Sequence, residues 1–77
     1  MSANISRLFG SAVRVHRTAA GISQEKLAER AGLHPTYVSM VERGVRKPTL
    51  DVAARLAKAL KVTLPALIEE AQRGGAK

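Results

Sequence analysis

Apolar residues recur at intervals of three or four along most of the chain, and no stretch alternates apolar and polar residues as a half-buried strand does. The chain is therefore expected to be helical. Gly21, Gly32 and Gly44 each follow a stretch with the helical period, and glycine readily accepts the left-handed conformation that ends a helix. These stops predict five helices and a flexible tail, at residues 5–20, 24–31, 35–43, 49–60, 64–72 and 73–77.

The residues just before the predicted helices favour these starting points. Ser23, Thr49 and Thr63 carry hydroxyl groups that can accept a hydrogen bond from a free N–H of the first turn. Pro35 suits the first position of the third helix, because the N–H that proline lacks would be unpaired there. His34 stands where a Ser, Thr, Asp or Asn cap is usual. Its ring either caps the helix weakly, touches a phosphate, or does neither.

Each predicted helix carries one apolar face. In the first helix this face holds Leu8, Phe9, Ala12, Val13 and His16, and in the fourth it holds Leu50, Ala53, Leu56, Ala57 and Leu60. The sequence has 77 residues with one Phe, one Tyr and no Trp, so one small core must be built almost entirely from aliphatic side chains. The pattern predicts an all-α fold, a compact single domain of five helices.

The third predicted helix has an unusual outer face. Val38 and Val41 line its inner side, whereas the opposite side presents small, polar, flexible or basic residues: Thr36, Ser39, Met40 and Arg43. A tight turn with Gly32 joins this helix to the second one, as in a helix-turn-helix. Because the major groove of DNA admits one α-helix, the outer face is predicted to contact base edges. Gln24, at the start of the second helix, is predicted to bind a phosphate.

Several of these residues also fit a purely structural role. Thr36 and Ser39 are compatible with an ordinary surface. Met40 is compatible with a gap-filling role in the core. Arg43 also suits the negative end of the helix dipole. Tyr37 either packs against the second helix or offers its hydroxyl to DNA.

Charge adds a partner to this picture. Thirteen Lys and Arg oppose six Asp and Glu, which gives a net charge of +7 and favours a polyanion such as nucleic acid, although solubility alone is the plainer explanation. Arg46 and Lys47, in the loop after the third helix, are predicted to bind phosphates. The other basic residues fit a solvated surface and receive no role: Arg14, Arg30, Arg55, Lys58 and Lys61.

Other classes of function have little support. The sequence has no Cys, no Ser–His–acid spacing, no glycine-rich phosphate loop and no cluster of metal ligands, so we expect neither an enzyme nor a cofactor or metal. No apolar run approaches the roughly 20 residues of a membrane span, and no secretory signal is evident. We therefore expect a cytoplasmic protein without membrane contact, and no small-molecule effector.

The motifs of this chain also carry a family resemblance. The stretch "GISQEKLAERAGLHPTYVSMVERGVRKPTLDVAARLAKALKV" resembles the phage-repressor (lambda-repressor-like, or xenobiotic-response-element-type) helix-turn-helix family, with "SQEKLA", "AGL" and "VSMVERG" at the family's spacings. The segment "LHPTYVSMVERGVRK" is similar to the controller proteins of restriction–modification systems. The resemblance implies transcriptional control by a dimer bound to an operator with two related halves.

The resemblance also implies roles for individual residues. Gln24 matches the phosphate-binding glutamine of the family, Arg46 and Lys47 match the loop that follows the DNA backbone, and Arg17 and Glu42 match a structural ion pair. The base- and backbone-reading positions match Thr36, Tyr37, Ser39, Met40 and Arg43. Pro35 departs from the arginine often found in controller proteins and cannot form a bidentate bond to guanine, so DNA deformability is expected to supply part of the specificity.

The fifth predicted helix has more apolar residues than a terminal helix of so small a domain must bury. Leu64, Leu67 and Ile68 therefore predict either a two-fold dimer interface or a lid over the core of a monomer. Our sequence-based hypothesis is a dimeric, sequence-specific DNA-binding regulator acting on a near-palindromic operator. The alternative is an antitoxin or another protein-interaction module with the same fold, since fold alone does not fix function.

Overall fold

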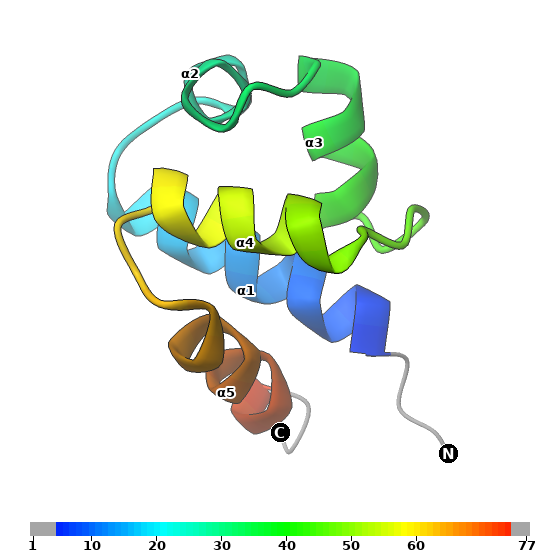
Figure 1. Ribbon diagram of the computed structural model, residues 1–77. Coiled ribbons are helices and arrows are strands. Elements are labelled where there is room, and N and C mark those ends of the chain that lie inside the picture. Colours follow the sequence, from blue (N-terminus) through cyan, green and yellow to red (C-terminus); the bar gives the residue numbers. More distant parts are fainter. Residues whose placement is uncertain (1–4, 75–77) are drawn as a thin grey trace.

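The computed structural model describes residues 5–74, and this part of the chain forms five α-helices and no strand. They are α1 (Ile5–Ala19), α2 (Gln24–Ala31), α3 (Pro35–Glu42), α4 (Leu50–Ala59) and α5 (Leu64–Gly74). The expected all-α class is confirmed. Figure 1 shows α4 in front of α1, with α2 and α3 on one side of this pair and α5 on the opposite side. Within residues 5–74, no helix has both the length and the apolar character to cross a membrane.

The helix boundaries follow local chemistry. Gly21, Gly32 and Gly44 have φ angles of 72°, 71° and 76°, so each adopts the left-handed conformation expected of a helix stop. The hydroxyl groups expected to cap three helices accept backbone N–H groups: Ser23 from Lys26, Thr49 from Val52 and Thr63 from Ala66, at 3.0, 3.1 and 3.2 Å. The last helix runs to Gly74, so residues 73 and 74 of the predicted tail are helical, and residues 75–77 lie outside the described residues.

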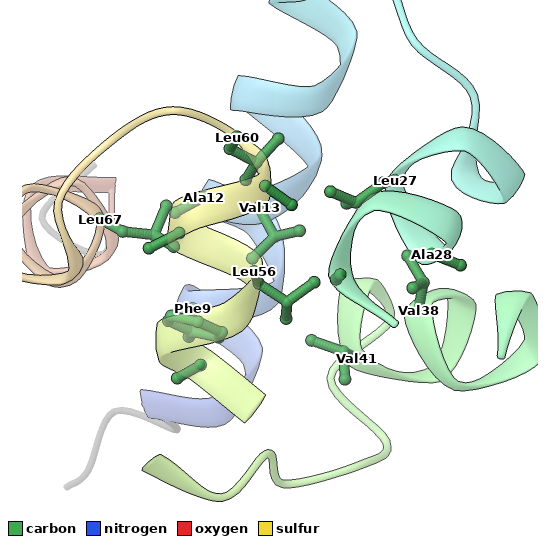
Figure 2. Close-up of a cluster of buried hydrophobic side chains, with 14 of the residues drawn as sticks. Phe9, Ala12, Val13, Leu27, Ala28, Val38, Val41, Leu56, Leu60 and Leu67 are labelled. Carbon is green, nitrogen blue, oxygen red and sulfur yellow. The ribbon is translucent and has the colours of Figure 1, made fainter. Parts of the chain in front are cut away.

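One apolar core joins all five helices. Figure 2 shows side chains from every helix pointing into the same interior, and the largest fully buried ones are Leu27, Leu56, Leu67, Val13, Val38 and Val41. The predicted inward face of α4 is wrong at one position. Leu50 is 83% exposed, because it is the first residue of α4 and no neighbouring helix covers it. His16 is half-buried at the edge of the core.

The backbones of α1 and α3 touch closely. Gly10 is buried in α1, and a methyl group at this position would overlap the carbonyl oxygen of Val41 in α3. Only a residue without a side chain permits this approach. The position of α3 on the domain is therefore fixed partly by backbone contact with α1, in addition to the burial of its two valines.

Candidate nucleic-acid interface

A short turn sets the angle between α2 and α3. After Ala31 the chain turns at Gly32, where the N–H of Leu33 returns to the Ala28 carbonyl at 2.8 Å. His34 then caps α3, since its Nδ1 accepts the N–H of Thr36 at 3.1 Å. Of the alternatives left open for His34, capping is therefore observed.

The two faces of α3 differ sharply. Val38 and Val41 are 0% exposed and belong to the core. On the opposite side, Thr36 and Arg43 are exposed, while Ser39 and Met40 are half-buried. Arg43 lies one residue beyond the helix and caps it, with its N–H on the Ser39 carbonyl at 3.1 Å. The four residues of the predicted outer face therefore lie outside the core.

A buried ion pair ties α3 to α1. Arg17 Nε donates to Glu42 Oε2 at 2.6 Å, and Arg17 Nη2 donates to Oε1 at 3.1 Å. A third bond runs from Arg17 Nη1 to the Ile22 carbonyl at 2.9 Å. The side chains are 13% and 3% exposed, and the hydrogen bond to Glu42 raises the pKa of Arg17 above its ordinary value. The pair expected from the family resemblance is thus present in the structure.

Gln24 joins the same cluster. Its Nε2 donates to Glu42 Oε1 at 3.0 Å, so the residue predicted to grip a phosphate also contacts the ion pair that holds α3. Sequence reasoning missed this contact. Gln24 and Glu42 are 18 residues apart on different helices, and no local spacing signals that their side chains meet.

Tyr37 and Arg46 stack on one another. The guanidinium carbon of Arg46 lies 5.3 Å from the centre of the Tyr37 ring, within range of a cation–π interaction. Tyr37 is half-buried and packs against the core. Whether its hydroxyl contacts DNA stays a prediction. Arg46 and its neighbour Lys47 are both exposed in the loop between α3 and α4.

The apolar surface at the other end of the domain differs from the predicted one. Leu67 is 0% exposed, so its proposed place in a dimer interface is wrong, and it belongs to the core. Leu64 and Ile68 are half-buried. Ile68 lines an open apolar groove of about 190 Å³, and other lining residues come from α1, α4 and the loop before α4: Ile5, Phe9, Pro48, Leu50 and Ala53. Leu50 and Ile5, which the interface prediction omitted, are 83% and 49% exposed.

The basic residues without an assigned role are mostly found between α2 and α4. Arg30, Arg55, Lys58 and Lys61 line an open cleft of about 530 Å³ near the C-terminal ends of both helices. Positive side chains are favourable at this position because a helix C-terminus carries a partial negative charge. Arg55 also lies 3.9 Å from Asp51. These contacts agree with a solvated basic surface.

Comparison with known proteins identifies the family. A helix-turn-helix family model matches residues 13–67, which include α2, α3 and α4. The chain belongs to the helix-turn-helix family. Control protein C.BamHI of Bacillus amyloliquefaciens is 46% identical over 63 residues, which are 80% of this chain and 78% of that protein. An HTH-type transcriptional regulator of Mycobacterium tuberculosis is 48% identical over 58 residues, 75% of this chain, and the chain spans 41% of that regulator's length.

Solved structures of helix-turn-helix proteins share the fold. The restriction-modification controller protein C.AhdI from Aeromonas hydrophila superposes with a TM-score of 0.78 and is 44% identical, with 80% of this chain and 94% of that chain covered. The controller protein C.Esp1396I, solved as a tetramer in complex with its natural 35 base-pair operator, gives a TM-score of 0.89 and 25% identity, with 99% and 100% covered. The resemblance to controller proteins is therefore confirmed.

Proposed function

We propose that this chain is a sequence-specific DNA-binding transcriptional regulator that acts as a dimer on a near-palindromic operator, in the manner of a controller protein. The observation that carries the proposal is the outer face of α3, which is free of the core although the opposite face of the same helix is fully buried. An enzymatic activity is not part of the proposal, and the site of action is the cytoplasm.

The proposed base contacts use the chemistry of the outer face. Thr36 and Ser39 supply hydroxyl groups that donate or accept, while the methyl of Thr36 and the thioether of Met40 suit a thymine methyl. Arg43, at the end of α3, reaches either guanine or a phosphate. Pro35 contributes no bidentate bond, so the deformability of the operator supplies part of the selectivity.

The proposed backbone contacts flank this face on both sides. Gln24 lies at the start of α2, and Arg46 and Lys47 follow α3. Such contacts set the register of the protein on the duplex and carry no sequence information. The phenol of Tyr37, held beneath the Arg46 guanidinium, is the remaining candidate for a phosphate or base.

The proposed dimer forms through the apolar groove between α1, α4 and α5. Ile68 lines this groove and keeps the interface role predicted for it, and the exposed Leu50 and Ile5 join it. Leu64 does not line the groove and stays a candidate at the edge of the interface. A two-fold interface pairs the same patch from both copies. It would set two copies of α3 about 34–36 Å apart, one turn of DNA. The operator-bound tetramer of C.Esp1396I supports assembly on DNA as the working state.

Selection from random duplexes tests the function. The full chain is expected to enrich a near-palindrome, and footprinting should show protection of both halves. Thr36→Ala with Ser39→Ala should change the preferred base at one or two positions of each half, by about 1–3 kcal/mol of discrimination. Ser11→Ala, on the exposed side of α1, is the matched control and should leave the preference unchanged. Failure to enrich any sequence would favour the protein-interaction alternative.

A further inference from the structure

A single buried carboxylate connects the proposed reading helix with the proposed phosphate contact. Glu42 is the last residue of α3, and its two oxygens accept three hydrogen bonds, two from Arg17 and one from Gln24. The three residues belong to α1, the first position of α2 and the last position of α3. This carboxylate is therefore the point at which three helices are fixed relative to one another.

The chemistry of the carboxylate determines which way the Gln24 amide faces. Carboxylate oxygens accept hydrogen bonds and do not donate them, so the amide must turn its nitrogen toward Glu42 and its oxygen away. One N–H of Nε2 is used in the 3.0 Å bond to Glu42. The second N–H leaves the nitrogen in another direction, and Gln24 is only half-buried. A phosphate also only accepts, so this second N–H is the group that can bind it.

Arg17 removes the electrostatic cost of this arrangement. An unpaired carboxylate behind the contact would repel a phosphate, especially where burial weakens the screening by water. Arg17 donates to both oxygens of Glu42 at 2.6 and 3.1 Å, so the pair beneath Gln24 carries no net charge. The amide can then present its N–H to an anion.

We propose that Glu42 is a positioning residue for DNA-backbone binding, because it holds the Gln24 amide with one N–H aimed at a phosphate. This inference rests on the proposed DNA-binding function. It gives the Arg17–Glu42 pair a role beyond stability. The proposed phosphate contact of Gln24 and the orientation of α3 depend on the same carboxylate. A duplex whose phosphate binds Gln24 is therefore also placed in register with α3.

A mutant cycle on the full chain tests the coupling. Gln24→Ala is made in the wild-type chain and in an Arg17→Met, Glu42→Leu background, where apolar replacement of a buried pair usually preserves stability. Fluorescence anisotropy measures affinity for a selected duplex and for an unrelated one. We expect Gln24→Ala to weaken both duplexes about tenfold in the wild-type chain and less than about twofold in the background. Equal losses in the two backgrounds would overturn the inference.

Two controls make the cycle specific. Lys47→Ala should weaken binding equally in both backgrounds, because its exposed side chain does not depend on Glu42. Circular dichroism and thermal unfolding should show that the double variant keeps its helices. A wild-type chain that binds no duplex would overturn the proposed function itself, an outcome distinct from binding without coupling.

The unaltered chain provides a second test that does not depend on any variant folding. The two protons on Gln24 Nε2 give separate NMR signals. The Gln24 amide proton that is hydrogen-bonded to Glu42 should exchange slowly with solvent before DNA is added. The second amide proton should exchange fast in the free chain and become protected when a duplex binds. Equal, fast exchange of both protons in the free chain, or no protection on binding, would refute the positioning role.

Discussion

Helices α3 and α5 are built alike at their starts but leave different surfaces. Both have a capped first turn that contains a proline, and each buries part of one face in the core. The uncovered side of α3 carries hydroxyl, thioether and guanidinium groups. By contrast, α5 leaves Leu64 and Ile68 half-buried, and Ile68 lines the apolar groove together with the exposed Leu50. The side chains that each helix leaves outside the core favour different proposed partners, DNA for α3 and a second copy of the chain for α5.

The two helices are also held in different ways. The end of α3 is tied by the buried ion pair with Arg17, and its backbone touches Gly10. Helix α5 is anchored by apolar side chains, Leu67 at 0% and Ala71 at 1% exposure. Hydrogen bonds and charges fix direction, whereas apolar burial is not directional. The helix proposed to meet DNA is thus the one with the more precise attachment.

The largest expected effect is on the attachment of α3. Glu42→Ala should lower the free energy of unfolding by about 3–5 kcal/mol, because the largely buried guanidinium of Arg17 would lose its counter-charge and keep only its bond to the Ile22 carbonyl. Urea unfolding followed by circular dichroism measures the change. Glu29→Ala removes a carboxylate from an exposed pair with Lys26 and should change stability by less than about 0.5 kcal/mol. Similar losses for both variants would contradict the distinction.

The effect of pH on the Arg17 side of the pair has a definite sign. The pKa of Arg17 is raised by its hydrogen bond to Glu42. The stability that this bond adds to the folded state is therefore fully present below the pKa of Arg17 in the unfolded chain, and it is lost only as pH rises through the higher pKa of the folded state. The stability difference between the wild-type chain and Glu42→Ala should therefore persist up to about pH 10.

The next effect separates core from interface near α5. Leu67→Ala should cost about 2–5 kcal/mol of stability, because it leaves a cavity in the core. Leu50→Ala should change the stability of the monomer by less than about 0.5 kcal/mol, yet weaken dimer formation about tenfold. Urea unfolding and equilibrium sedimentation measure the two quantities. A dimer dissociation constant that Leu50→Ala leaves unchanged would show that the interface does not involve the apolar groove.

The smallest effect concerns the two caps. His34→Ala and Thr63→Ala should each lower stability by about 1 kcal/mol, and His34→Asn should restore most of the loss at α3. Only the His34→Ala change should also weaken DNA binding, because it frays the helix proposed to enter the major groove. Thermal unfolding measures the change in stability, and fluorescence anisotropy with a selected duplex measures the change in DNA affinity. Equal effects of the two alanine variants on DNA affinity would argue against α3 as the reading helix.

Sequence reasoning succeeded where the determining physics is local. Helical periodicity, glycine stops and hydroxyl caps depend on neighbouring residues, and they predicted the five-helix fold. Leu50 was placed in the core although it is exposed, and for Leu67 the choice between interface and core lid stayed open, because both fit an apolar face and periodicity does not say how far a neighbouring helix extends over it. The Gln24–Glu42 bond and the Tyr37–Arg46 stack were missed for a similar reason, since each joins side chains from separate elements.

The closeness of Gly10 to Val41 has an evolutionary consequence. Two backbones in direct contact leave α3 no room to slide or roll on α1. A lineage that acquires a new target must then do so by exchanging side chains on the exposed half of α3, with the scaffold unchanged. If the exposed residues of α3 contact bases as proposed, the rest of the domain is a fixed scaffold for them, and α3 is the helix on which to graft the outer residues of a relative.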